Sequence, residues 1–361
     1  MIAKREHIPI AKPRIDEEMI GAIEEVLNSG ILTQGPKVRE FEEEFAEYIG
    51  VEYAVATNSG TSALHTALSS LGIRKGDEVI TSTFSFISTA SCVLMQGAKP
   101  VFCDIDPKTY NINPDETERK ISDRTKAVIV VHLYGHPCDM RRVVEICEDY
   151  DLALIEDACQ AHGAEYEGKK VGSFGEGCFS FYPTKNMTTG EGGMITTNND
   201  KVAKMARMIR DHGQRGRYLH TTLGYNYRMT DIAAAIGLAQ LKRLDWFNEQ
   251  RIKNATYYNR KLDNERIQKP FIAENVKHVF HQCTIRVKER DRFLIHLKNN
   301  GIGYGVYYPT PIHKQPIFNE YNELTLPEAE HACKEVVSIP VHPALSKEKL
   351  EYVVEVVNAY E

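Results

Sequence analysis

The chain has 361 residues, of which 42% are hydrophobic and 26% are charged, so it holds enough apolar material for a large domain and a smaller one. This composition excludes a disordered or fibrous chain. The formal net charge of -6 excludes a general basic surface for nucleic acid or anionic lipid.

The eight cysteines are scattered and form no C-x-x-C pair, so neither a zinc site nor a dithiol site is expected. Residues 1–7 carry charges where a secretory peptide needs an apolar core, and no apolar run approaches membrane-spanning length. We therefore expect a soluble, cytoplasmic protein that binds neither nucleic acid nor membrane.

Between residues 50 and 200, short β-branched runs alternate with helical stretches, a pattern typical of a mostly parallel sheet covered by helices. Several of the runs are apolar throughout, as in strands buried on both faces. The candidate strands are 53–57, 78–83, 100–104, 127–132, 152–156, 178–182 and 194–197. The predicted class is α/β.

Thr230 and Asp231 have the character of a helix cap, and a long amphipathic segment follows to about residue 262. After it, a strand-like run at 279–287, a helical run at 292–299 and a Gly/Tyr/Pro-rich tract indicate a smaller α/β unit. We expect a large domain over residues 15–245 and a small domain formed by residues 246–361 together with 1–14.

Residues 58–64, Asn-Ser-Gly-Thr-Ser-Ala-Leu, follow a predicted strand and open a helix. Their N–H groups and hydroxyls would converge where the helix dipole favours an anion, so this turn is a candidate phosphate site. The alternative is a simple helix cap. The spacing matches neither G-x-G-x-x-G nor a P-loop.

Asp157 lies at the C-terminal end of a predicted strand, the edge of an open α/β sheet where ligands collect. Pyridoxal-phosphate (PLP) catalysis needs an anion beside the pyridine nitrogen, and this carboxylate suits that task. The alternative is a loop or capping carboxylate.

Lys185 follows another predicted strand on a turn, with Gly190–Gly193 just beyond it. An amine partly shielded from water loses proton affinity and becomes nucleophilic enough to form an imine. Ser180, earlier on the same strand, could reach a phosphate oxygen. The alternative is an exposed lysine on a turn. The joint order of hydroxyl-rich turn, aspartate, serine and lysine favours a cofactor site.

With these residues in place, the chain resembles the DegT/DnrJ/EryC1/StrS sugar aminotransferases, which have the aspartate-aminotransferase-like fold (PLP fold type I). Matching blocks cover nearly the whole length: 58–64, 76–80, 97–102, 156–158, 180–185, 189–194 and 224–229. The resemblance implies a large domain with a mostly parallel seven-stranded sheet and a smaller C-terminal α/β domain.

The resemblance also implies residue roles. Lys185 is the Schiff-base lysine that also moves protons, and Asp157 pairs with the ring nitrogen of PLP. The residues that would hold the phosphate are Gly60, Thr61, Ser62 and Ser180.

Four further positions match less specific parts of the family pattern. Phe86 falls where an aromatic ring stacks on the pyridine, or it is a core residue. Gln160 falls where a polar side chain reaches the phenolic oxygen of the cofactor, or it is a surface glutamine. Asn226 is implied to cross the interface of a homodimer and touch the partner's cofactor phosphate. Arg228, close to the same site, is a candidate substrate contact.

The tract 307–313 resembles the family's substrate-facing segment, so Tyr308 and His313 are candidate substrate contacts; a buried, hydrogen-bonded histidine is the alternative for His313. The stretches 131–137 and 165–168 resemble perosamine-synthetase-like enzymes, which aminate C4 of a nucleotide-linked 4-keto-6-deoxy sugar. Perosamine synthetases often carry an acid where this chain has Gln160.

The expected activity is therefore transfer of an amino group from L-glutamate to a nucleotide-linked keto-sugar, giving an amino-sugar for a surface polysaccharide or related glycan, without a metal. Three alternatives remain open. A regulatory or binding protein could keep the fold without the chemistry. A sugar 3-dehydratase would carry histidine in place of Lys185, and a nicotinamide oxidoreductase would need a Gly-rich fingerprint after its first strand.

Overall fold

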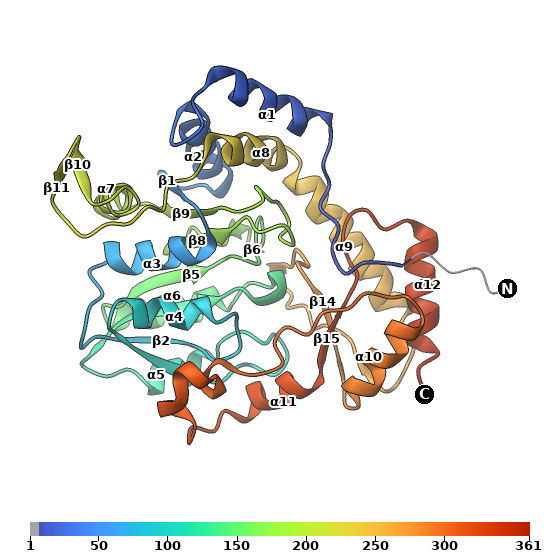
Figure 1. Cartoon of the computed structure of the whole chain (residues 1–361). Helices are drawn as coiled ribbons and strands as arrows, with labels where there is room; N and C mark the ends of the chain where they lie inside the picture. Colours follow the sequence, from blue (N-terminus) through green and yellow to red (C-terminus); the bar gives the residue numbers. More distant parts are fainter. Residues whose placement is uncertain (1–6) are drawn as a thin grey trace.

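A single seven-stranded sheet organises the computed structural model, which describes residues 7–361 (Figure 1). Its strand order is β1-β9-β8-β5-β4-β2-β3, and β9 alone runs antiparallel to its neighbours. The strands are β1 (Tyr53–Thr57), β2 (Glu78–Ser82), β3 (Lys99–Cys103), β4 (Thr125–Val131), β5 (Ala153–Asp157), β8 (Glu176–Ser180) and β9 (Gly193–Thr197). The predicted α/β class and mostly parallel sheet are confirmed.

Helices cover both faces of this sheet because its side chains alternate between two buried layers. Val55, Ile129 and Ile155 pack against one helical layer, and Ala54 and Leu154 face the opposite one. The first layer contains α3 (Gly60–Ser70), α4 (Ser88–Met95) and α7 (Asp200–Ile209). The second contains α2 (Pro36–Ile49), α6 (Met140–Asp149) and α8 (Asp231–Leu241).

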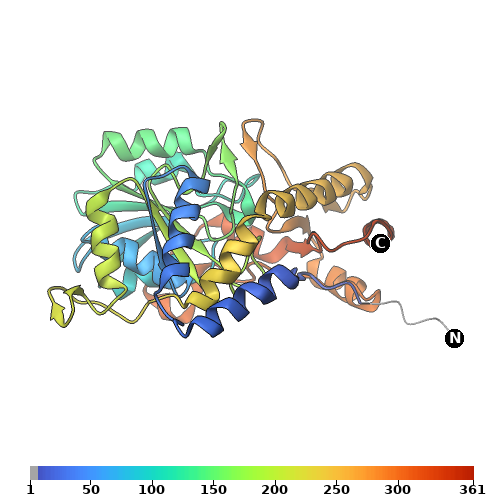
Figure 2. The same cartoon turned by 90° about the horizontal axis from the view of Figure 1, so that it is seen from above.

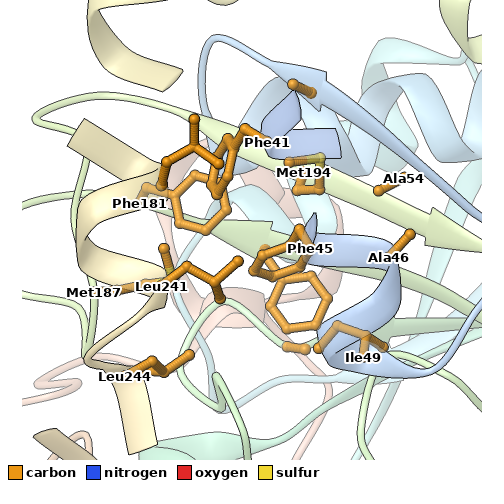
Figure 3. Close-up of a cluster of buried hydrophobic side chains, with 14 of the residues drawn as sticks. Phe41, Phe45, Ala46, Ile49, Ala54, Phe181, Met187, Met194, Leu241 and Leu244 are labelled. Carbon is orange, nitrogen blue, oxygen red and sulfur yellow. The ribbon is translucent and has the colours of Figure 1, made fainter. Parts of the chain in front are cut away.

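An aromatic cluster fixes α2 and α8 on the second face (Figure 3). The ring of Phe181 lies 5.2 Å from that of Phe41 and 5.5 Å from that of Phe45, measured between centroids. Gly237 allows α8 to approach, since a Cβ there would lie 2.7 Å from the Phe41 ring. This cluster sits directly behind the turn that follows β8.

A second hydrophobic core forms among elements that lie beside the sheet, toward the C-terminus (Figure 2). It combines Ile8 with residues of a small antiparallel sheet and three helices. Its elements are β12 (Ile267–Gln268), β14 (Cys283–Val287), β15 (Val336–Ile339), α9 (Leu244–Lys261), α10 (Arg290–Asn299) and α12 (Lys347–Asn358). The domain limits 15–245 and 246–361 with 1–14 stay a prediction, and residues 1–6 of that prediction lie outside the described part of the chain.

The remaining elements connect or flank these two cores. They are α1 (Glu17–Ser29), α5 (Pro114–Arg119), α11 (Pro327–Glu335), β6 (Glu165–Tyr166), β7 (Lys169–Lys170), β10 (Gln214–Gly216), β11 (Leu219–His220) and β13 (Val276–Lys277). Short 3-10 turns are η1 (Leu133–Gly135), η2 (Ile312–Lys314) and η3 (Pro316–Tyr321). None of the helices within residues 7–361 combines the length and apolar character that crossing a membrane requires.

Two expectations about the C-terminal part were wrong. The long amphipathic segment predicted up to about residue 262 is two helices, α8 and α9. They are separated at Arg243, whose guanidinium pairs with Asp16 and Glu18. The strand-like run at 279–287 is a strand only from Cys283. Its first part bends at Phe280, where φ is 46°, and runs instead along the wall of the cavity described below.

A buried ion pair holds β1 to α2 and to the C-terminal end of α7. Arg210 donates to the carboxylate of Glu42 and, at 2.7 Å, to the carbonyl of Ala56, while Glu42 accepts the N–H of Ala56 at 2.9 Å. We predict that Arg210→Met lowers the free energy of unfolding by about 3–5 kcal/mol, because it strands a buried carboxylate. Urea denaturation measures this. Lys204→Met, which breaks an exposed pair, should leave the urea midpoint nearly unchanged, and a loss equal to that of Arg210→Met would contradict a stabilising role of the buried pair.

Candidate active site at the carboxyl edge of the sheet

A cavity of about 550 Å³ opens where the carboxyl ends of β5 and β8 meet the start of α3. Ligands collect at this edge of open α/β sheets. Its far wall comes from the C-terminal part of the chain, through Gln282 and Tyr308. Segments distant in the sequence thus enclose one space.

Lys185 enters this cavity from the turn after β8. The turn is closed by its backbone N–H, which donates to the carbonyl of Tyr182 at 2.9 Å. Burial lowers the pKa of the Lys185 amine below its ordinary value of 10.5, although the nearby Cys159 thiol and Asp157 carboxylate raise it. A larger share of this amine is therefore neutral, and nucleophilic, than in an exposed lysine.

Asp157 is the last residue of β5, and its carboxylate is 5% exposed. Because side chains alternate along a strand, Asp157 lies on the same face as Ile155, toward α3 and α4. Its Oδ2 accepts a 2.7 Å hydrogen bond from the hydroxyl of Thr89 on α4, and Oδ1 accepts from the N–H of Cys159 at 3.3 Å. The carboxylate is held in one orientation beside Lys185.

The neighbouring Glu156 points to the other face and has a structural role. It accepts the backbone N–H groups of Gly172 at 2.8 Å, Phe174 at 2.8 Å and Gly175 at 2.9 Å, and it also lies 3.0 Å from the ring of His132. Because side chains alternate along β5, the carboxylate of Glu156 is used in the protein interior, whereas that of the neighbouring Asp157 faces the cavity.

The start of α3 supplies an anion site. Ser59, Gly60 and Thr61 line the cavity, and the first N–H groups of a helix have no partner within it. Ser180, on the cavity face of β8, packs so closely that a Cβ on Gly60 would lie 2.7 Å from its own Cβ. The Ser62 hydroxyl instead closes the helix cap, donating to Asn58 Oδ1 at 2.7 Å, and is outside the lining.

Two further predicted residues line the cavity. Phe86 has an exposed ring, 53% accessible, whose centroid is 6.2 Å from that of Tyr308. Gln160 donates through Nε2 to the Tyr308 hydroxyl at 3.1 Å. Their contacts with a cofactor stay predictions.

Asn226 and Arg228 are outside the lining of the cavity in their own chain. Asn226 is exposed, and its carbonyl accepts from the Asn58 side chain at 3.2 Å. Arg228 pairs with Asp211. The predicted contact of Asn226 with a partner's cofactor stays a prediction.

His313 is also outside the lining, and its ring is fully buried. Its Nδ1 lies 2.7 Å from the Thr83 hydroxyl and its Nε2 lies 3.3 Å from the Glu330 carboxylate. The buried, hydrogen-bonded alternative is the arrangement found, so His313 braces the segment that carries Tyr308 and does not itself face the cavity.

Sequence reasoning missed Thr89, Ser85, His281 and Gln282. Thr89 is an ordinary helical threonine in sequence, and only the fold brings it to Asp157. The other three line the cavity. His281 and Gln282 lie in the run read as strand, and Arg251 fixes that run by donating to the carbonyl of His281 at 3.2 Å. Burial keeps the pKa of His281 well below its ordinary value.

These groups fit PLP. The partly buried amine of Lys185 lies near the fixed carboxylate of Asp157. The start of α3 offers hydroxyls and free N–H groups to a phosphate, at a position where Gly60 leaves no room for a Cβ. The aromatic ring of Phe86 is accessible on the same cavity wall.

Comparisons with known proteins agree with this set of groups. The profile of the DegT/DnrJ/EryC1/StrS aminotransferase family matches residues 13–358. A pleiotropic regulatory protein of Geobacillus stearothermophilus is 43% identical, over 95% of this chain and 94% of its own length. A GDP-perosamine synthase of Caulobacter vibrioides is 40% identical over 96% of each chain. The crystal structure of DesV from S. venezuelae superposes with a TM-score of 0.94, at 36% identity, over 98% of each chain.

The Thr89–Asp157 bond generates a prediction. Thr89→Val keeps the shape of the side chain but removes the donor that orients Asp157, so we expect the affinity of the apoprotein for PLP to fall about three- to tenfold, since a typical hydrogen bond contributes about 0.5–1.5 kcal/mol net. Thr89→Ser retains the hydroxyl and should stay within about twofold of the parent affinity. Fluorescence titration with PLP measures both, and equal losses in the two variants would show that Thr89 acts only through packing.

Proposed function

Since this chain belongs to the DegT/DnrJ/EryC1/StrS aminotransferase family, we propose that it transfers the amino group of L-glutamate to a nucleotide-linked keto-sugar. The enzyme is a PLP-dependent sugar-nucleotide aminotransferase, and its relatives include a GDP-perosamine synthase and a putative sugar aminotransferase solved in its PMP form. The observation that carries the proposal is Lys185, an amine of lowered pKa inside a cavity that also holds Asp157.

Each residue of the cavity has a separate role in binding the cofactor or in moving a proton. PLP, when bound, supplies an electron sink for the charge left as a Cα–H bond breaks. Asp157 is the anion for the ring nitrogen, and Thr89 holds its carboxylate at 2.7 Å. The start of α3 and Ser180 would bind the phosphate. Lys185 anchors the cofactor and, once free, carries the proton from the Cα of the amino donor.

Over one cycle, the nitrogen of L-glutamate replaces the carbonyl oxygen of the sugar, and glutamate leaves as 2-oxoglutarate. The two substrates occupy the same cavity in turn, so its walls must position both relative to the Lys185 amine. A space of about 550 Å³ with one wall from the C-terminal part of the chain suits this requirement.

For the sugar we propose a 4-keto-6-deoxy hexose aminated at C4, whose product enters a surface polysaccharide or related glycan. Support comes from the 40% identity with the GDP-perosamine synthase of C. vibrioides. At one position of the cavity this chain departs from that group, since Gln160 replaces the acid common in perosamine synthetases.

We also propose that the enzyme works as a homodimer with shared sites. Asn226 is exposed and absent from the cavity of its own chain, which is what a residue that completes the partner's site would require. The β10–β11 hairpin, close to it in sequence, stands away from the body of the subunit (Figure 1).

A regulatory function is the second candidate, favoured by the name of the relative from G. stearothermophilus. The presence of Lys185, Asp157 and Ser180 around one cavity counts against a role without chemistry. Incubation with L-glutamate and UDP-, GDP- and dTDP-linked keto-sugars separates the two functions. A sugar product with the mass of an amine supports the transferase, and absence of product and of 2-oxoglutarate with every sugar contradicts it.

Lys185→Ala should abolish turnover and remove the absorption band of the lysine-bound cofactor. The reason is that, among residues 7–361, Lys185 is the one lysine in the cavity lining that can form the covalent link. Turnover assays and absorption spectra check this. The surface variant Lys204→Ala is the control and should retain both the turnover and the absorption band. Unchanged turnover in Lys185→Ala would reject the mechanism.

Asp157→Asn should lower turnover far more than cofactor affinity, on the order of 100-fold or more against less than tenfold, because it removes charge while preserving shape. It should also lower the pKa of Lys185 further, since the Asp157 carboxylate raises that pKa in the parent. The pH dependence of PLP binding tests the sign. Equal losses of affinity and turnover would make Asp157 a structural residue.

A further inference from the structure

The carboxamide of Gln160 can lie only one way round. Its Oε1 accepts the backbone N–H of Tyr134 at 2.9 Å. A backbone N–H is only a donor, so the oxygen of the carboxamide must face Tyr134 and the nitrogen must face the other way. Nε2 is indeed 3.1 Å from the hydroxyl of Tyr308.

This orientation determines the direction of the hydrogen bond between Gln160 and the Tyr308 hydroxyl. An amide nitrogen is only a donor, so the hydroxyl oxygen accepts from Gln160 and its own proton is not consumed in that bond. Tyr308 and Gln160 both line the cavity that contains Lys185. Burial raises the pKa of Tyr308, so the hydroxyl keeps its proton across the physiological range.

The backbone N–H of Tyr134 is the first donor in this series of hydrogen bonds, and the backbone around it is held rigidly. The N–H of Leu133 donates to Asn111 Oδ1 at 3.0 Å, and the carbonyl of Tyr134 accepts the N–H of Gln282 at 3.3 Å. The Tyr134 hydroxyl donates in turn to the carbonyl of Tyr307, which fixes the backbone next to Tyr308. The fold therefore positions both ends of the hydrogen-bond series that runs from Tyr134 through Gln160 to Tyr308.

We propose that Tyr308 donates its hydroxyl proton to an acceptor oxygen of the ligand in this cavity, and that Gln160 is a positioning residue that fixes the direction of that proton. The proposal rests on the proposed function, which places both a phenolic oxygen, on PLP, and the oxygens of a sugar in the cavity. Either oxygen has the required chemistry, and the experiment below distinguishes them.

Gln160→Glu reverses the direction with almost no change in shape. One carboxylate oxygen would still accept the N–H of Tyr134, but the other can only accept, so the Tyr308 hydroxyl would turn its proton toward Glu and away from the ligand. Gln160→Glu should thus remove the same ligand bond that Tyr308→Phe removes. This reversal also gives a physical reason why an amide or an acid at this position would select different ligands.

The test measures binding without turnover for Tyr308→Phe, Gln160→Glu and the double variant. One arm titrates the apoprotein with PLP and follows the pH midpoint of the bound cofactor's absorption. The other titrates the PLP form with the nucleotide-linked amino sugar that the enzyme makes. If none forms, it uses the tightest binder among UDP-N-acetylglucosamine, GDP-mannose and dTDP-glucose. Tyr321→Phe, which removes a buried hydroxyl outside the cavity, is the matched control.

We expect each single variant to weaken one probe about five- to tenfold, and the double variant to be no weaker than the singles, because all three lose one and the same bond. The arm that responds identifies the acceptor oxygen. The proposal would be overturned if the affinity losses of the two single variants multiplied in the double variant, or if Gln160→Glu bound the probe as tightly as the parent. Unchanged affinity in both arms for all variants would overturn it as well. The PLP arm needs no sugar, so it can fail or succeed independently of the proposed function.

Melting curves show whether each variant folds. Should Gln160→Glu not fold, Gln160→Leu replaces it and leaves the Tyr308 hydroxyl unoriented. Tyr308→Phe should then cost less affinity in the Gln160→Leu background than in the parent, and an equal cost would contradict a positioning role for Gln160.

Discussion

The site depends on one buried, hydrogen-bonded carboxylate at the end of a parallel strand. Asp157 is 5% exposed, and the Thr89 hydroxyl holds it at 2.7 Å on the same face of the sheet as Ser180 and the start of α3. An isolated buried charge would be costly, so the hydrogen bonds that orient Asp157 also make its burial possible. The same carboxylate acts on the Lys185 amine, whose pKa it raises against the effect of burial.

The strand positions could be read from the sequence because buried parallel strands are short, apolar and β-branched. The alternation along them then determines that Asp157 faces α3 while Glu156 faces the opposite layer, where it binds the protein. Lys185 and Gly60 were also predictable, through their order along the chain and their resemblance to a known family. The Gly60 prediction has a clear physical basis, since any Cβ there would collide with Ser180.

Contacts made only by the tertiary fold were not predictable. Thr89 meets Asp157 across 68 residues, and no local pattern marks it. The run at 279–282 has strand composition, yet it bends at Phe280 and turns His281 and Gln282 toward the cavity. For His313 both readings were open, and the carboxylate of Glu330 and the hydroxyl of Thr83 decide in favour of a buried brace.

The central claim is that Lys185 carries PLP and that the protein accepts an amino group from L-glutamate. The absorption spectrum of the purified protein, recorded before and after addition of L-glutamate alone, tests it most directly. The account predicts a band of lysine-bound PLP that bleaches as 2-oxoglutarate appears in equal amount. A protein with no such band after reconstitution with PLP, or a band that glutamate leaves unchanged, would contradict it.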